Sequence, residues 1–203
     1  MPTSPAPHAA SGTDSELLRR MQAGDSAAFD ALYRRHQGPL FRFCLMRSGA
    51  PGTAADVVQE TFIGLLTGAL QFDPLRGSLA NFLFGVGRNL LLKHQRGNGP
   101  APFASLPDSA EFDDDIDDTI CTAPTPLQRL LLDEQAEQVR RALSSLPPHY
   151  RDVLILYELH ERSYLDIAAI CQLDIGTVRS RLSRGRAALA RRLQAWRAPL
   201  STA

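Results

Sequence analysis

The residues with the clearest capacity for chemistry lie on a predicted helix near the end of the chain, residues 176–193. At the helical repeat of about 100° per residue, Val178, Leu182 and Leu189 share one narrow arc and are expected to face a core. The opposite side combines small residues, which let a helix approach the DNA major groove, with arginines, which read guanine edges or hold phosphates. The alternative is a charged face that meets only solvent. The residues expected to contact duplex DNA are Thr177, Arg179, Ser180, Ser183, Arg184 and Arg186.

A second polar face is predicted on a helix over residues 79–96, opposite its apolar seam. Amide and guanidinium groups on such a face are suited to hold nucleic-acid backbone or bases. Phe84 lies off the seam, so its ring either stacks on an unpaired base or packs against another helix. Asn81, Arg88 and Gln95 lie opposite the seam, with Asn89 and Arg96 on one shoulder. The residues expected to contact nucleic acid are Asn81, Arg88, Asn89 and Arg96.

A third group of residues has the opposite charge. Asp56, Gln59 and Glu60 follow i, i+3, i+4 spacing on the side of a predicted helix that faces away from its apolar stripe. Acidic groups in this arrangement suit docking on a basic protein surface and repel DNA. The alternative is that they complement the dipole at the start of the helix.

These faces require helices to position them. Both halves of the chain show helical periodicity and no convincing period-two segment, which predicts an all-α fold. Asp25 is a suitable N-cap for one helix, Thr53 opens the next with a capping-box-like pattern, and Pro148 can begin a helix after a Pro-Pro break. A short helix over 164–171, a tight turn and the longer basic helix then follow the helix-turn-helix pattern.

The charge distribution divides the chain, although 22 basic residues cancel 22 acidic ones among 203. Residues 97–126 contain seven acidic residues and no basic ones, and their Gly, Pro and Ser content is typical of a flexible linker. Two small helical domains are therefore predicted, at 16–96 and 127–196, after a disordered tail at 1–15. We expect the linker to be a solvated tether, although its charge would also allow it to mask the basic modules.

Several function classes find no support in the residues. No metal-binding or nucleophile motif is found, so we expect neither an enzyme nor a bound cofactor. Cys44, Cys121 and Cys171 are too dispersed for a zinc site or a disulfide framework. No apolar run approaches the ~20 residues of a membrane-spanning helix, and residues 1–15 lack the pattern of a secretion signal. A cytoplasmic protein without membrane insertion is expected.

Four motifs in the chain resemble those of the extracytoplasmic-function (ECF) group of bacterial RNA polymerase sigma factors, within the sigma-70 family. They are DVVQETF at 56–62, FLF at 82–84 followed by RNL at 88–90, LPPHYR at 146–151, and GTVRSRLSRGR at 176–186. Their order and spacing are more specific than any one of them. The chain departs from the family pattern in having Phe82 where tryptophan is usual, Gly85 where a basic residue is common, and Gln172 in place of a frequent turn glycine.

The resemblance implies a function and its partners. A protein of this family binds core RNA polymerase, through the clamp helices of the beta-prime subunit and through the beta subunit, and directs initiation at promoters. Asp56, Gln59 and Glu60 would bind the polymerase, while the face carrying Asn81, Arg88, Asn89 and Arg96 would read the minus-ten element as single strand. The 176–193 helix would read the minus-thirty-five element, and an anti-sigma factor is an expected further partner.

A helix-turn-helix regulator that binds operator DNA without polymerase is the alternative. It accounts for the second domain, but it gives no role to Asp56, Gln59 and Glu60 or to the polar helix face over 79–96.

Overall fold

The computed structural model describes residues 12–97, here the first module, and residues 136–197, the second module. No strand occurs in either module, which confirms the predicted all-α fold. Most of the predicted acidic linker and of the predicted tail lies outside the described residues. None of the described helices is both long and apolar enough to cross a membrane.

The first module is a bundle of helices around an apolar core that includes Leu17, Leu32 and Phe43. Thr13 caps its first helix by accepting a hydrogen bond from the N–H of Glu16, and this helix was not predicted from the sequence. The helices are α1 (Asp14–Gln22), α2 (Ser26–Ser48), α3 (Pro51–Leu66) and α4 (Leu79–Gly97), with a 3-10 turn at Pro74–Arg76.

The N-termini of α2 and α3 differ in how they match the predictions. Asp25 caps α2 as expected, and its carboxylate accepts hydrogen bonds from the backbone N–H groups of Ala27 and Ala28 at 3.0 and 3.2 Å. The predicted capping box at Thr53 is wrong, because α3 already begins at Pro51 and has no side-chain cap. Proline suits this first position, since the N–H that it lacks would have no partner inside the helix.

The second module contains a helix at 136–144 followed by the predicted helix-turn-helix. Pro148 is the first helical residue of α6, as predicted, and Ser163 with Asp166 forms a capping box on α7. Gln172, between α7 and α8, adopts the left-handed conformation with φ 56° and ψ 54°. The elements are α6 (Pro148–Leu154), a π-helical turn (Ile155–Leu159), α7 (Tyr164–Cys171) and α8 (Ile175–Arg197).

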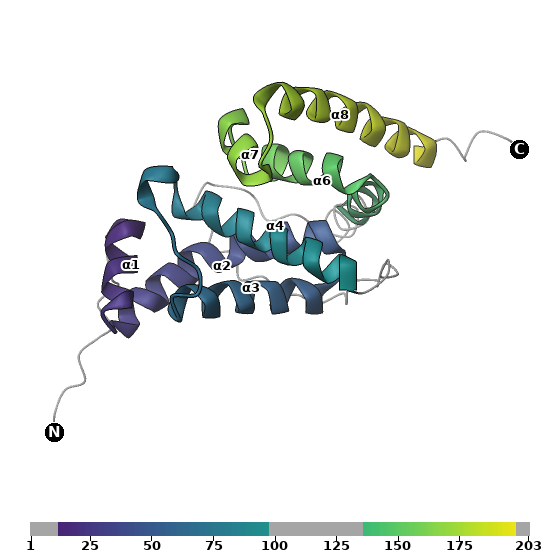
Figure 1. The fold of residues 1–203 in the computed structure, drawn as a ribbon. Helices are drawn as coiled ribbons and strands as arrows, with labels where there is room; N and C mark the ends of the chain where they lie inside the picture. The colour runs from purple at the N-terminus through teal and green to yellow at the C-terminus, as the bar shows by residue number, and fades with distance from the viewer. Residues whose placement is uncertain (1–11, 98–135, 198–203) are drawn as a thin grey trace, which may run out of the picture.

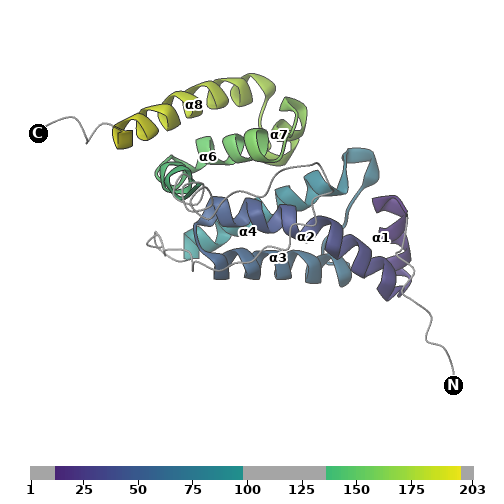
Figure 2. The same ribbon diagram turned by 180° about the vertical axis from the view of Figure 1, so that it is seen from behind.

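The two modules pack directly against each other. Figures 1 and 2 show α3 and α8 on opposite outer sides of the molecule, with α2 and α4 between them and α6 and α7 lying against α4. Phe43 and Phe84 of the first module belong to the same buried cluster as Val153 and Ile155 of the second. The helix α4 therefore lies at the boundary, and its polar side faces the second module.

Candidate nucleic-acid and protein interfaces

The helix α8 presents the predicted DNA-contacting face to solvent. Val178 and Leu182 are 0% and 1% exposed, so they hold the helix on the module core as the spacing predicted. The N–H and hydroxyl of Thr177 donate to the Asp174 carboxylate at 2.7 and 2.6 Å, and these bonds lower the pKa of Asp174. Thr177 is half-buried. The other predicted contacts are exposed: Arg179, Ser180, Ser183, Arg184 and Arg186.

Two tyrosines, which were not among the predicted site residues, support arginines of this face. The guanidinium carbon of Arg179 lies 5.8 Å from the ring centre of Tyr164, and that of Arg186 lies 4.9 Å from the ring centre of Tyr157. Arg186 also donates to the Glu158 carboxylate at 2.7 Å, a bond that raises the pKa of the arginine. The rings restrict both guanidiniums, and Glu158 additionally holds the Nε edge of Arg186.

The polar face of α4, unlike that of α8, is hydrogen-bonded to the second module. The side-chain amide of Asn81 donates to Oδ1 of Asp166 at 2.5 Å, and Nε of Arg88 donates to Oδ2 of Asp152 at 2.9 Å. Asn89 is exposed, and the side chain of Arg96 lies outside the described residues. The structure therefore brings Asn81, Arg88 and Asn89 to one side of α4, but carboxylates of the second module already bind two of them.

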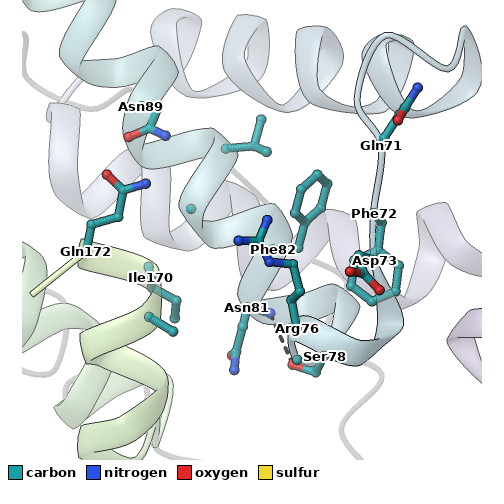
Figure 3. Close-up of a pocket in the computed structure, with 14 residues that line it drawn as sticks. Gln71, Phe72, Asp73, Arg76, Ser78, Asn81, Phe82, Asn89, Ile170 and Gln172 are labelled. Carbon is teal, nitrogen blue, oxygen red and sulfur yellow. Dashed lines mark hydrogen bonds between the residues drawn. The ribbon is translucent and has the colours of Figure 1, made fainter.

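A cavity of about 470 Å³ opens beside this face, between the 71–78 loop, α4 and α7 (Figure 3). In its wall, the ring centres of Phe72 and Phe82 lie 5.5 Å apart. Aromatic rings next to amides and a guanidinium can stack and hydrogen-bond an unstacked base. A loop over 71–78 was predicted from the sequence but was given no binding role, although its aromatic and charged residues directly precede a polar helix. The polar residues lining the cavity are Gln71, Asp73, Arg76, Ser78, Asn81, Asn89 and Gln172.

Phe84 does not contribute to that cavity. Its side chain is 2% exposed, and its ring centre lies 5.4 Å from that of Phe43 and 4.8 Å from that of His160. Of the two alternatives that the sequence left open, packing against another helix is correct and stacking on an unpaired base is wrong.

The helix α3, which carries the acidic patch, lies on the side of the first module away from the second (Figures 1 and 2). Asp56, Gln59 and Glu60 are all exposed, and Ile63 and Leu66 on the same helix are 51% and 52% exposed. Because α3 begins at Pro51, Asp56 lies beyond the first turn, where the helix dipole has little effect. The geometry therefore favours a docking surface over dipole compensation.

The two modules match two family models. Residues 32–100 match sigma-70 region 2, and residues 136–189 match sigma-70 region 4. An RNA polymerase sigma-H factor of Pseudomonas aeruginosa is 32% identical over 185 residues, which are 89% of this chain and 94% of that protein. The chain belongs to the sigma-70 family of RNA polymerase sigma factors. The first module is its region 2, and the second is its region 4.

Other relatives carry the ECF designation in their names. An ECF RNA polymerase sigma-E factor of Escherichia coli is 33% identical over 90% of this chain and 95% of that protein. The ECF RNA polymerase sigma factor SigE of Mycolicibacterium smegmatis is 32% identical over 80% of this chain, and the match spans 62% of that protein. These similarities favour the sigma-factor interpretation over the operator-binding regulator.

Two solved structures share the fold of most of the chain. CnrH, in complex with the cytosolic domain of CnrY, has a TM-score of 0.64 and 25% identity over 90% of this chain and 97% of that one. The sigma factor RpoE in complex with the anti-sigma factor NepR, from Bartonella quintana, has a TM-score of 0.57 and 25% identity over 82% and 96%.

A buried ionic cluster that the sequence analysis missed joins region 2 of this sigma factor to region 4. The Arg47 side chain is 0% exposed and donates to Oδ1 of Asp152, whose side chain is 3% exposed. Arg88 donates to the second oxygen of the same carboxylate, and Arg47 also donates to Gln95 at 3.3 Å. One carboxylate on α6 therefore binds α2 and α4 together.

Arg151 extends this cluster along the backbone. Its guanidinium donates to the carbonyls of Leu143 and Leu146, each at 2.9 Å, and to that of Ser144. Across the boundary it donates to the carbonyl of Arg47 at 2.8 Å. Burial, followed by the charge of Arg47, lowers the pKa of Arg151 to about 10, so the guanidinium stays charged near neutral pH. Guanidiniums therefore outnumber carboxylates in this cluster.

His160 lies at the same boundary, beside Phe84 and Phe43. Burial, followed by the charges of Arg42 and Arg162, lowers the pKa of His160 to about 4. The ring is therefore neutral near pH 7. Its Nε2 is buried and has no hydrogen-bond partner among the described residues.

Proposed function

We propose that this protein is an ECF-type sigma factor that binds core RNA polymerase and directs it to promoters with a minus-ten and a minus-thirty-five element. The observation that carries the proposal is the separation of three polar faces on three helices, acidic on α3 and arginine-bearing on α4 and α8. The chain itself performs no catalysis in this role, because the reaction belongs to the polymerase. The role places the protein in the cytoplasm, where the polymerase acts.

The face of α3 is the proposed polymerase contact. Asp56, Gln59 and Glu60 border the exposed apolar side chains of Ile63 and Leu66. An apolar strip with an acidic margin suits a helical partner surface that carries basic residues. The clamp helices of the beta-prime subunit are the proposed partner.

The face of α4 is proposed to hold the minus-ten element. Asn81, Arg88 and Asn89, with Arg96 further along the helix, supply amides and guanidiniums, and the rings of Phe72 and Phe82 beside them can stack on an unstacked base. Bases flipped out of a duplex expose the edges that carry sequence information. This face therefore suits single-stranded DNA.

The exposed face of α8 is proposed to read the minus-thirty-five element as duplex. Ser180 and Ser183 keep the centre of the face small, while Arg179, Arg184 and Arg186 surround it. A helix of this shape enters the major groove with its arginines near base edges and phosphates. Thr177, at the start of the helix, lies next to this face.

The beta subunit, bound through region 4, and an anti-sigma factor are the further proposed partners. The solved neighbour RpoE is in complex with the anti-sigma factor NepR. A regulator of that kind would bind the same polar faces and keep them from the polymerase and the promoter.

Polymerase binding tests the proposal directly. Replacing Asp56 and Glu60 together by lysine should abolish binding to core polymerase, because the patch would then repel a basic partner. Binding is measured by native gel shift, and circular dichroism verifies the fold. The matched control replaces Glu16 and Asp30, exposed acids on α1 and α2, by lysine and should bind normally. Unchanged binding by the patch variant contradicts the docking assignment, and failure of the wild type contradicts the function.

A further inference from the structure

We propose that the arginine cluster between α2, α4 and α8 is a binding site for a small inorganic oxyanion of the phosphate class. The side chains that would hold the ion are Arg47 on α2, Arg88 on α4 and Arg181 on α8. The site follows from the contacts of the folded chain and does not depend on a role in transcription.

Arg47 is a buried cation with an unused donor. Its side chain is 0% exposed, its Nε donates to Oδ1 of Asp152, and its Nη2 donates to Oε1 of Gln95 at 3.3 Å. Its Nη1 is buried and has no partner among the described residues. A charged donor that is buried without an acceptor is costly, so an acceptor is expected at Nη1.

The charges around Arg47 do not balance. Arg88 donates Nε to the second oxygen of Asp152, while the guanidinium of Arg151 is bonded to neutral backbone carbonyls. Three guanidiniums therefore share one carboxylate. A water molecule at Nη1 would accept a hydrogen bond but would leave the excess positive charge, whereas an anion would supply both the acceptor and the missing negative charge.

Arg181 adds a fourth positive charge. It is half-buried, and it forms no hydrogen bond or ion pair with another described residue. Burial raises the pKa of the Cys171 thiol to about 11, so this neighbour is neutral and supplies no counter-charge. The charges of Arg88, Arg181 and Arg47 act on the same thiol in the opposite direction, so the three guanidiniums lie near one buried side chain.

Gln95 provides the way into the site. The residue is exposed, and its 3.3 Å hydrogen bond to Arg47 is long for an N–H···O bond. When this amide turns outward, Nη1 and Nη2 of Arg47 remain as a fork of donors. Two oxygens of a tetrahedral oxyanion match such a fork. Arg88 lies two turns before Gln95 on the same face of α4, and its side chain is 14% exposed.

Phosphate is also the repeating group of DNA, so a free ion and a DNA strand share the chemistry of this site. Arg47 is fully buried, however, and a phosphodiester carries a sugar on two of its four oxygens. A free ion is therefore the proposed occupant.

Thermal unfolding of the full chain measures the binding. Sodium phosphate is titrated at pH 7.5 and at constant ionic strength, which is held with sodium chloride. The midpoint should rise and then level off, by about 3 °C when phosphate reaches ten times its Kd, and calorimetry should give one ion per chain. No rise, or a rise that never levels off, would overturn the inference, since the latter is the general effect of an excluded salt.

Gln95→Glu is the decisive variant. Its carboxylate would take the Arg47 fork, so the midpoint without phosphate should rise and the phosphate-dependent increase should disappear. Gln22→Glu makes the same change at an exposed position at the end of α1 and should keep the full increase. Equal responses to phosphate in Gln95→Glu and the wild type would overturn the inference.

Arg181→Gln tests the other side of the site. It should weaken phosphate binding about tenfold, because one charge-assisted hydrogen bond is lost. The control Arg184→Gln changes the exposed face of α8 and should bind phosphate as the wild type does. If Arg184→Gln lost the affinity and Arg181→Gln kept it, the ion would lie on the DNA-contacting face and the inference would be wrong. Should Arg181→Gln fail to fold, Gln95→Glu still decides, because it alters an exposed residue.

A thymidine dinucleotide, which carries a single phosphodiester, separates the free ion from DNA. It should not raise the midpoint, and an increase equal to that with phosphate would assign the site to a DNA strand and overturn the free-ion proposal. Polymerase and promoter take no part in these measurements, so a negative result would leave the proposed function untouched.

Discussion

The helices α4 and α8 carry similar chemistry and meet different surroundings. Each combines an apolar seam with an opposite face of arginines and small or amide residues. On α8 that face is exposed, whereas on α4 it lies against region 4, where Asp152 and Asp166 bind Arg88 and Asn81. Amphipathic periodicity therefore determines which side of a helix is polar, but does not determine whether that side meets water, DNA or another part of the chain.

The difference has a functional meaning for a two-site DNA reader. Duplex DNA can approach α8 while the two regions are in contact, because Arg179, Ser180, Ser183 and Arg184 are exposed, although Glu158 of the same module binds Arg186. On α4, by contrast, Asp152 and Asp166 already bind Arg88 and Asn81. Duplex recognition and strand capture are therefore expected to respond differently to the same mutations.

The largest predicted effect is a loss of DNA affinity when arginines of α4 or α8 are replaced. Replacing Arg179 or Arg184 by alanine should weaken binding to a minus-thirty-five duplex by about 1–3 kcal/mol each, in the wild type and in the Asp152→Asn variant alike. Arg88→Ala should weaken single-strand binding mainly in the Asp152→Asn variant, where the arginine has been released from its carboxylate. Fluorescence anisotropy measures both affinities.

The control for these variants is Arg34→Ala, which removes the same charge from an exposed position on α2. The affinity of this variant for the duplex and for the single strand should fall little. If Arg88→Ala lost the same strand affinity in both backgrounds, the contrast between a covered α4 and an open α8 would be incorrect.

A smaller effect on the contact between the two regions is predicted when the pH is lowered. While the two regions are in contact, the pKa of His160 is about 4, lowered first by burial and then by the charges of Arg42 and Arg162. Separating the regions removes the burial and the Arg42 charge, so the pKa rises toward 6.5, whereas Arg162 donates to the His160 carbonyl and moves with it. The open form therefore gains a proton first as pH falls below about 6.5. Between about pH 6.5 and pH 4, the arrangement with the regions in contact should be destabilised relative to the open form by about 1.4 kcal/mol for each unit by which the pH falls. No change is expected above pH 6.5 or below about pH 4.

The distance between spin labels at Thr67 and Ala187 checks this effect between pH 7.5 and 5. His160→Phe is the control, since phenylalanine preserves ring packing against Phe43 and Phe84 and cannot be protonated. Opening that is identical in the control and the wild type would assign the pH response to other groups.

The smallest predicted effect is in the turn before α8. Gln172 holds a left-handed conformation that glycine adopts without a side-chain penalty, so Gln172→Gly should raise the free energy of unfolding by about 0.5–1 kcal/mol. Gln172→Ala keeps the steric penalty and should show no such gain. Urea unfolding measures both, and equal stabilities of the two variants would show that the turn is unstrained.

Local patterns in the sequence were sufficient for much of the fold. The arc of Val178 and Leu182 correctly oriented α8, and Asp25 correctly marked the start of α2, because periodicity and capping act over a few residues. The start of α3 was missed because Ala50 provides no side-chain cap and Pro51 begins the helix instead of Thr53. The capping box of Ser163 and Asp166 has a local signature and could have been found.

The boundary between the regions could not be predicted in this way. Arg47 and Asp152 are 105 residues apart, and nothing in the residues around either one indicates the other. Phe84 is off the predicted seam because it packs on His160 of region 4 as well as on its own module. The second contact surface of α4 exists only after both modules have folded.

Start-site mapping of transcription in vitro shows whether this protein directs core polymerase to promoters. Core polymerase free of sigma is mixed with the wild type or with Asp152→Asn on DNA of the bacterium that encodes the chain, and RNA 5′ ends are sequenced. The account predicts a defined set of start sites, each preceded at constant spacing by two shared elements, with more product from Asp152→Asn. Start sites indistinguishable from those of core polymerase alone, with both proteins, would contradict it.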